Sequence, residues 1–260
     1  MSNLLEVKNV TKRFGGVVAN RNVSFTIEEK KITGLIGPNG AGKSTLFNMV
    51  SAVFPPSEGE IWFRNERIDS YPAYKVAPLG ISRTFQNLQV FKKMTVIENV
   101  MVGLHTRTSS GILAAAFSFP SSKKEEAEMY EKAVEALRFA GLEDDCGTVA
   151  ANLPLGKLRL LELARAIATG PKLLLLDEVA AGLNHQETLE MSRLILKTRE
   201  QGIAIFVVEH DMDLVMGICD KIIVLDQGEK IAEGAPKSVQ SNQRVIEAYL
   251  GASEEEEMTV

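Results

Sequence analysis

Alternating apolar and polar positions mark the N-terminal part of the chain as a set of half-buried strands. Successive side chains of a β-strand point to opposite faces, so a period of two indicates one face on a core and one on solvent. The apolar positions of this pattern are Leu5, Val7, Val10, Val23, Phe25, Ile27, Ile61 and Phe63. The pattern predicts a small antiparallel sheet near the N-terminus.

A second group of segments is apolar at nearly every position, as in strands that are buried on both faces of a parallel sheet. These segments are 31–36, 173–176, 203–208 and 222–225. Helix-period stretches lie between them, notably 158–169 and 187–201. Strands that alternate with helices predict an α/β core with right-handed crossovers.

Residues 91–155 interrupt this alternation. They contain a loop rich in Gly, Ser and Pro at 109–122, followed by an amphipathic helical pattern over about 123–140. That pattern directs apolar residues to one side and pairs of Lys and Glu to the other. We therefore expect a helical subdomain inserted into the α/β core.

Composition and charge narrow the class of protein. The chain has 260 residues, of which 45% are hydrophobic and 24% charged, and 29 Lys and Arg stand against 34 Asp and Glu. The net charge of −5 argues against a dedicated nucleic-acid binder, and no apolar stretch approaches the roughly 18–20 residues that cross a bilayer. Glu6 and Lys8 are not typical of a signal peptide, and two cysteines suit a reducing cytoplasm.

A phosphate-binding loop follows the first fully apolar strand. Its sequence matches the pattern G-x-x-x-x-G-K-[ST] and lies between that strand and a helix predicted over 43–50. Glycines let backbone N–H groups converge on an anion, the lysine adds a charge for the phosphates, and the serine hydroxyl can bind Mg²⁺. The candidate nucleotide-binding residues are Gly37, Pro38, Asn39, Gly40, Ala41, Gly42, Lys43, Ser44 and the adjoining Thr45. The loop predicts nucleoside triphosphate binding.

Two adjacent acidic residues end another apolar strand. Asp177 and Glu178 follow four leucines, which places both side chains at the end of a buried strand. Asp177 can hold Mg²⁺ directly or through water, whereas Glu178 can accept a proton from an attacking water as a general base. An acidic strand end that only caps the next helix is the alternative interpretation.

Together these motifs resemble the nucleotide-binding subunit of ATP-binding cassette (ABC) transporters, over residues 4–251. The resemblance implies ATP and Mg²⁺ as ligands and ATP hydrolysis coupled to transport as the activity. It also implies that Gln86 helps to bind Mg²⁺, that His210 contacts the γ-phosphate, and that Phe14 stacks on adenine. A core role for Phe14 remains the alternative. The family fold is a P-loop NTPase core with a mixed, mostly parallel sheet.

The domain organisation expected from this resemblance has three parts. Residues 1–90 and 156–235 form the ATP-binding α/β core with its antiparallel β subdomain, and 91–155 form the inserted helical subdomain. Residues 236–260 are expected to contain a helix near 242–250 and then an acidic tail.

The chain departs from the family in its signature segment, which normally reads Leu-Ser-Gly-Gly-Gln and contacts the nucleotide held by the other protomer. Leu155, Gly156 and Lys157 are the candidate contacts here, and Lys157 is expected to direct its charge to the γ-phosphate. Pro154 replaces the serine and has neither a hydroxyl nor an N–H group. We expect this change to affect the rate of hydrolysis, and a weak or silent ATPase is the alternative.

Several stretches are most similar to subunits of branched-chain amino acid importers, among them 83–86, 94–100, 181–184, 209–212 and 245–251. Urea or amide importers and lipopolysaccharide-export ATPases share much of this pattern and remain alternatives, as does a soluble ABC ATPase without a membrane partner.

The transporter resemblance implies a peripheral protein at the cytoplasmic face of the inner or plasma membrane. The implied partners are two integral membrane permease subunits, a second ATP-binding subunit of the same or another kind and, indirectly, a solute-binding protein. A permease helix is expected near Gln86, on an apolar floor of Leu88, Val90 and Phe91. These three residues are core residues in the alternative interpretation.

Overall fold

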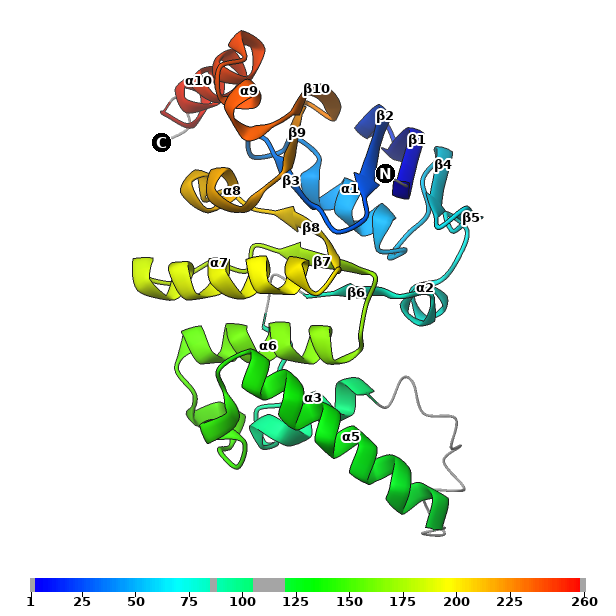
Figure 1. Cartoon of the computed structure of the whole chain (residues 1–260). Helices are drawn as coiled ribbons and strands as arrows, with labels where there is room; N and C mark the ends of the chain where they lie inside the picture. Colours follow the sequence, from blue (N-terminus) through cyan, green and yellow to red (C-terminus); the bar gives the residue numbers. More distant parts are fainter. Residues whose placement is uncertain (1–2, 85–87, 105–119, 258–260) are drawn as a thin grey trace.

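The structure, a computed structural model of the chain, describes residues 3–84, 88–104 and 120–257. Figure 1 shows two β-sheets in the upper part of the molecule and a layer of helices below them. Among the described residues, no helix combines the length and the apolar character that crossing a membrane requires.

The first sheet contains the N-terminal strands. Within the described part of the chain it has four antiparallel strands in the order β2-β1-β4-β5. Val7 of β1 pairs with Phe25 on one side and Ile61 on the other, and all three are buried. The antiparallel sheet predicted from the alternating pattern is therefore confirmed. Its strands are β1 (Asn3–Phe14), β2 (Val17–Glu28), β4 (Glu58–Phe63) and β5 (Glu66–Arg67).

The second sheet carries the nucleotide-site motifs. Its described strands follow the order β10-β9-β3-β8-β7-β6, and all neighbours are parallel except β10 and β9. Every residue of β3, β7 and β8 is buried, which confirms the prediction from their unbroken apolar runs. The strands are β3 (Ile32–Ile36), β6 (Ile81–Arg83), β7 (Leu173–Asp177), β8 (Ala204–Val208), β9 (Lys221–Asp226) and β10 (Glu229–Gly234).

Two hydrophobic cores cover the two faces of this sheet. Leu174 and Leu176 of β7 join a core that includes α6 and α7, whereas Leu173 and Leu175 join the core that contains α1. Helices α1 and α6 therefore lie on opposite faces of the sheet, as expected when successive side chains alternate. The helices on these cores are α1 (Lys43–Val50), α2 (Ala73–Leu79), α6 (Leu155–Ala168), α7 (His185–Glu200), α8 (Met212–Ile218) and α9 (Pro236–Gln240).

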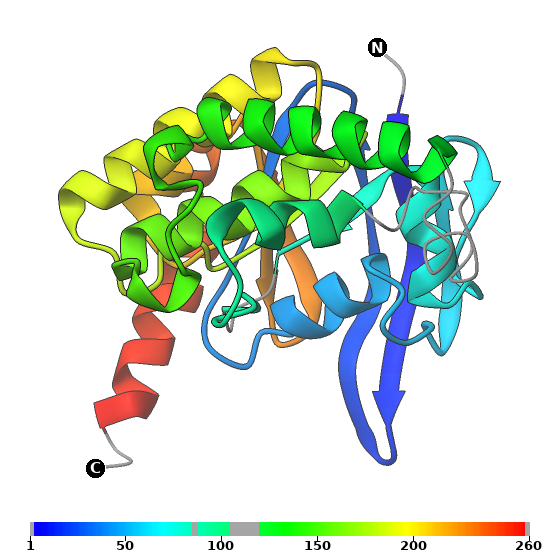
Figure 2. The same ribbon diagram turned by 90° about the horizontal axis from the view of Figure 1, so that it is seen from below.

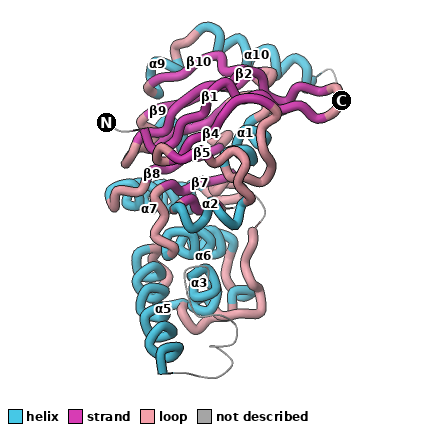
Figure 3. Tube along the Cα trace, turned by 90° about the vertical axis from the view of Figure 1, so that its right-hand side faces the viewer, coloured by secondary structure: helices cyan, strands magenta, loops and turns pink. Residues whose placement is uncertain are grey.

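A layer of packed helices lies below the sheets. Val96, Val100, Ala133 and Leu137 are buried between helices that also contact α6. Figure 2, which views the molecule from below, shows this layer in front of the strands, and Figure 3 shows it from the side. Its elements are α3 (Val96–Leu104), α5 (Pro120–Phe139), and the 3-10 turns η2 (Glu143–Asp145) and η3 (Ala150–Asn152). The division of the chain into domains at residues 90 and 155 stays a prediction.

The C-terminal helix differs from the prediction. Helix α10 (Gln243–Glu257) continues to Glu257, although the sequence pattern indicated an end near Leu250 and an irregular acidic tail. Glutamate is a good helix former, and extending an existing helix is far easier than nucleating one. These two effects outweigh the weak repulsion between neighbouring acidic side chains.

Candidate nucleotide-binding site

The phosphate loop connects the end of β3 to the start of α1, as the sequence predicted. Gly42 precedes α1 with a φ of 92°, a left-handed conformation that favours glycine. A Cβ atom on Gly42 would lie 2.5 Å from the Ala19 carbonyl oxygen and 2.6 Å from Asn20 Nδ2. Asn20 Nδ2 also donates a hydrogen bond to the Gly42 carbonyl at 3.2 Å. The hairpin of the first sheet thus packs directly against the loop and requires glycine there.

The first turn of α1 is suited to an anion. The N-cap residue Gly42 makes no side-chain cap hydrogen bond, and the first turn contains no acidic residue. Unpaired N–H groups at a helix N-terminus carry partial positive charge and bind phosphate readily. Ser44 and Thr45 belong to this turn, so their backbone groups and hydroxyls adjoin the same anion site.

Lys43 keeps its side chain within the loop. Its Nζ atom donates hydrogen bonds to the carbonyl oxygens of Gly37 at 2.7 Å and Pro38 at 2.9 Å. Partial burial lowers the pKa of Lys43, and the nearby charge of Glu178 opposes that shift. The electrostatic interaction between Lys43 and Glu178 brings the loop and the end of β7 into one site.

Asp177 ends β7 and lies beside Val208 of β8. Its carboxylate is nearly buried, and Oδ2 accepts a hydrogen bond from Arg83 Nη2 at 2.9 Å. Burial raises the pKa of Asp177, and the hydrogen bond and charge of Arg83 oppose this shift. Arg83 therefore holds the candidate Mg²⁺ ligand, a contact that no motif had indicated.

Glu178 follows in a strained backbone conformation. Its φ of 47° lies in the left-handed region, which costs a non-glycine residue about 1–2 kcal/mol. Its N–H group donates to the Val208 carbonyl at 2.9 Å and holds the chain in this turn. Strained residues of this kind concentrate at functional sites. This conformation ends the extended path of β7 directly after Asp177.

The described donors fit Mg²⁺ of the kind bound together with a nucleotide. Ser44 and Asp177 offer hard oxygen atoms, which this ion prefers. Within the described ranges, no cluster of three or more His, Cys, Asp and Glu side chains could hold a metal ion. Gln86, the third predicted ligand, lies outside the described residues.

His210 and Glu209 follow β8. The His210 side chain is 68% exposed, so its imidazole is accessible to a ligand. Glu209 is buried, and its carboxylate accepts hydrogen bonds from the N–H groups of Ala180 at 2.8 Å and His210 at 3.3 Å. Burial raises the pKa of Glu209, and the Ala180 hydrogen bond opposes the shift. Through these hydrogen bonds, Glu209 connects the segment after Glu178 to His210. In the sequence, the only sign of this role is an acidic residue at the end of an apolar strand.

Phe14 lies at the end of β1 with its side chain 48% exposed. Its ring packs edge-on against Phe54, with 5.5 Å between the ring centroids, and Lys12 Nζ lies 5.1 Å from the Phe14 centroid. This exposure favours the stacking interpretation over that of a core residue. An exposed ring flanked by a cation suits an aromatic base and its phosphates.

The signature residues begin α6, with Pro154 as the N-cap. Leu155 is partly exposed, whereas Gly156 is buried so close to the Glu187 side chain that a Cβ atom would lie 2.5 Å from its carboxylate. Lys157 Nζ forms an ion pair with Asp145 at 2.7 Å. Asp145 in the helical layer therefore competes with a phosphate for the charge of Lys157.

The C-terminal helix also reaches the phosphate loop. Tyr249 of α10 forms a hydrogen bond with the Gly37 backbone, and that bond opposes the increase in the Tyr249 pKa that burial causes. Gly37 is enclosed, because a Cβ atom there would lie 2.1 Å from the Leu225 carbonyl oxygen. Tyr249, which lies near the C-terminus, thus bonds the first residue of the phosphate loop.

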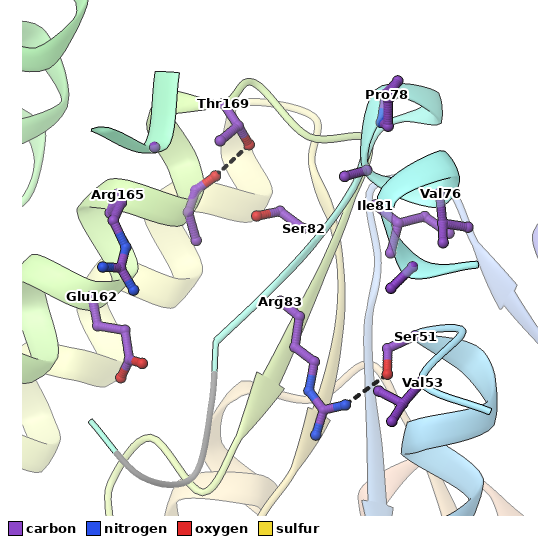
Figure 4. Close-up of a pocket in the computed structure, with 14 residues that line it drawn as sticks. Ser51, Val53, Val76, Pro78, Ile81, Ser82, Arg83, Glu162, Arg165 and Thr169 are labelled. Atoms are coloured by element: carbon purple, nitrogen blue, oxygen red, sulfur yellow. Dashed lines mark hydrogen bonds between the residues drawn. The ribbon is translucent and has the colours of Figure 1, made fainter. Parts of the chain in front are cut away.

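A groove of about 330 Å³ separates the helical layer from the α/β part. Figure 4 shows side chains from α2, β6 and α6, and from the turn that follows α1, around it. Its lining includes Ser51, Val76, Pro78, Arg83, Glu162 and Arg165.

The predicted floor of Leu88, Val90 and Phe91 does not line this groove. Val90 packs on the core, and Phe91 is 47% exposed with its ring 5.9 Å from the Arg165 guanidinium. The side chains that line the groove come instead from elements distant along the chain, and the place of a permease helix stays a prediction.

Comparisons with known proteins agree with this geometry. A family model described as "ABC transporter" matches residues 20–181, and one described as "Branched-chain amino acid ATP-binding cassette transporter" matches residues 229–255. The chain is 42% identical to the high-affinity branched-chain amino acid transport ATP-binding protein BraF of Pseudomonas aeruginosa, over 95% of this chain and 98% of BraF. It is 41% identical to LivG of Escherichia coli K12, which carries the same description, over the same shares of the two chains.

Solved structures show the same fold. The crystal structure of the ADP conformation of MJ1267, an ATP-binding cassette of an ABC transporter, superposes with a TM-score of 0.85 at 34% sequence identity. The match covers 96% of this chain and all of that one. A nucleotide-free ATP-binding cassette from an ABC transporter superposes with a TM-score of 0.84 at 33% identity, over 95% and 99% of the two chains.

Proposed function

The chain belongs to the ABC transporter family, and we propose that it is the ATP-hydrolysing subunit of an importer for branched-chain amino acids. The observation that carries the choice of cargo is its identity of 41–42% to LivG and BraF over 95% of the chain. The match of residues 229–255 to the branched-chain amino acid family model supports the same choice.

ATP binding would use the surfaces described above. The phosphates would lie against the N–H groups of the loop and of the first turn of α1, and Lys43 would exchange its bonds to Gly37 and Pro38 for bonds to phosphate oxygens. Phe14 would stack on the adenine ring. Ser44 and Asp177 would hold Mg²⁺, which supplies charge neutralisation of the phosphates when it is bound.

Hydrolysis would depend on two residues at the ends of β7 and β8. Glu178 would accept the proton of the attacking water, and His210 would contact the γ-phosphate and orient that water. The Glu209 hydrogen bonds to Ala180 and His210 support this assignment, because they connect the segments that carry the two side chains.

A second ATP-binding subunit is part of the proposal. Helices α1 and α6 lie on opposite faces of one sheet, so this sheet separates the helix that follows the phosphate loop from the helix that begins with the signature residues. Leu155, Gly156 and Lys157 would instead contact the nucleotide of a facing protomer. Since ATP would then bridge two chains, it would bind the closed pair better than the open one and favour closure.

The groove shown in Figure 4 is proposed as the seat of a helix from one of the two membrane permease subunits. It is open, mainly apolar, and carries charged side chains at Arg83, Glu162 and Arg165, which suits a helix with an apolar face and polar ends. This contact would hold the chain at the cytoplasmic face of the membrane. A solute-binding protein would act on the permeases and not on this chain.

Affinity purification from gently solubilised membranes, followed by mass spectrometry, tests the proposal. We expect two multi-span permeases and a second ATP-binding subunit, and an Ala77→Arg variant should lose the permeases because it fills an exposed position of the groove. Gln240→Arg, an exposed change on α9, is the matched control. Recovery of only soluble proteins, ribosomes or DNA would overturn the transporter role.

The cargo needs a separate measurement. Transport of radiolabelled leucine, isoleucine and valine into vesicles that contain the reconstituted complex should depend on ATP. Uptake of urea in place of these amino acids would show that the cargo was wrongly assigned.

A further inference from the structure

Arg83 occupies a junction between the groove and the nucleotide site. It ends β6, and its side chain is only 15% exposed. Nη2 pairs with Asp177 Oδ2 at 2.9 Å, while Nη1 donates to Asn48 Oδ1 and to Ser51 Oγ, both at 2.7 Å. The guanidinium also lies over the Phe47 ring, 4.8 Å from its centroid.

These contacts join two separate parts of the site. Phe47 and Asn48 belong to α1, the helix that begins at Lys43, and Ser51 is its C-cap. Asp177 ends β7, two strands away from β3 in the sheet. The planar fork of an arginine reaches the two partners with two separate nitrogen atoms, whereas a lysine would have to reach both from one nitrogen.

Arg83 also forms part of the groove wall. Arg83 and Ser51 both line the groove, and Figure 4 shows their side chains bonded to each other there. A side chain that enters the groove therefore meets the same guanidinium that holds Asp177. Any change in the bonds that Arg83 makes with α1 alters its hold on that carboxylate.

The charge of Arg83 bears directly on a cation at Asp177. A positive charge that is hydrogen-bonded to a carboxylate opposes the binding of a second cation to the same group, and partial burial strengthens that effect. Arg83 consequently orients Asp177 and weakens its attraction for Mg²⁺ at the same time.

We propose that Arg83 is a positioning residue that restrains Asp177 and transmits the occupancy of the groove to the Mg²⁺-binding end of β7. An occupant that draws the guanidinium toward α1 and the groove weakens its hold on Asp177 and strengthens metal binding with ATP. This inference rests on the proposed function, because it takes the permease helix as the occupant.

The first test uses the isolated chain and needs no partner. Binding of Mn²⁺, as a stand-in for Mg²⁺, is followed by electron paramagnetic resonance in the presence of ATP, and affinity for a fluorescent ATP analogue is measured in EDTA. We expect Arg83→Gln to lower the Mn²⁺ midpoint about tenfold, because a charge is lost beside the carboxylate. Affinity for the analogue without metal should stay within about twofold, since the phosphate loop is not altered.

Two further variants separate charge from a general disturbance. Arg83→Lys keeps the positive charge and should keep the Mn²⁺ midpoint near that of the parent chain. Arg67→Gln makes the same chemical change in an exposed ion pair of the first sheet and should leave the midpoint unchanged. An Arg83→Gln midpoint equal to that of the parent would overturn the restraint on Asp177.

The second test uses the assembled transporter. The parent complex should bind Mn²⁺ with a midpoint at least about threefold lower than the isolated chain. Arg83→Lys should remove this difference, because a lysine has one nitrogen in place of the two that bond α1 and Asp177. A difference that persists in Arg83→Lys would overturn transmission through Arg83. This measurement also decides the matter if Arg83→Gln does not fold.

The two possible failures are distinguishable. Absence of permeases from the purified complex contradicts the proposed function, yet the isolated-chain measurement still tests the contact between Arg83 and Asp177. A complete complex with no shift in either test contradicts the role of Arg83 and leaves the transporter assignment in place.

Discussion

Replacing Glu178 by glutamine tests the proposed general base with little disturbance of the fold. The substitution exchanges a carboxylate for an amide of the same shape, and both residues carry a Cβ atom at the φ of 47°. The backbone strain is therefore equal in the two proteins. We expect the free energy of unfolding to stay within about 0.5 kcal/mol of the parent value.

The expected loss of activity is large. A positioned general base typically contributes a factor of about 10²–10⁴ to the rate, which corresponds to about 2.7–5.4 kcal/mol in the activation free energy. Binding of ATP should be equal or tighter, because the change removes a negative charge near Lys43. Since ATP would then persist between the subunits, the variant should accumulate as a closed dimer.

Phosphate release in single-turnover reactions of the assembled transporter measures the rate, and light scattering with ATP measures the dimer. Glu178→Gly serves as a companion variant. It also removes the carboxylate, but relief of the left-handed strain, about 1–2 kcal/mol, exceeds the flexibility cost of glycine, about 0.5–1 kcal/mol. The free energy of unfolding should therefore rise by up to about 1.5 kcal/mol while activity is lost. Hydrolysis by Glu178→Gln at the parental rate would show that Glu178 is not the base.

Three further predictions concern the loop, the buried acid and the cysteines. Lys43→Ala should weaken ATP binding about 10- to 150-fold in calorimetry, because it removes charged hydrogen bonds of about 1.5–3 kcal/mol, and unchanged binding would contradict the phosphate-loop assignment. Glu209→Ala should lower the free energy of unfolding by about 1–3 kcal/mol in urea titrations, since it deprives two N–H groups of their acceptor, and an unshifted urea midpoint would refute this. Burial raises the pKa of Cys219 to about 12, so only about one thiol in ten thousand is ionised at pH 8. Iodoacetamide should therefore modify the partly exposed Cys146 first, and equal rates by mass spectrometry would show that Cys219 is accessible.

Local patterns predicted much of the fold and the core of the site. The apolar runs at β3, β7 and β8 and the helix after the loop were placed to within about a residue, because burial on both faces leaves an unbroken apolar stretch. The phosphate loop is also local, since its glycines, lysine and helix start are contiguous. Asp177 and Glu178 could be located at the end of β7 for the same reason, whereas their roles stay predictions.

Contacts between distant segments could not be predicted in this way. Arg83 meets Asn48 and Asp177 only because β6 lies beside β7 and α1 packs on the same face, and no spacing in the sequence encodes that order. The pairing of Lys157 with Asp145 depends likewise on how η2 packs against α6. Hydrophobic patterns specify which face of an element is buried, but not which element covers it.

The two hydrogen bonds of Lys43 within its own loop bear on how fast a nucleotide can associate. Because Lys43 already bonds two carbonyl groups of the ordered loop, an arriving phosphate would have to displace one flexible side chain. The encounter rate would then be governed by diffusion and by the attraction between the anion and the positive end of α1. After each turnover, Lys43 would return to the Gly37 and Pro38 carbonyl groups, and the loop could then bind the next nucleotide.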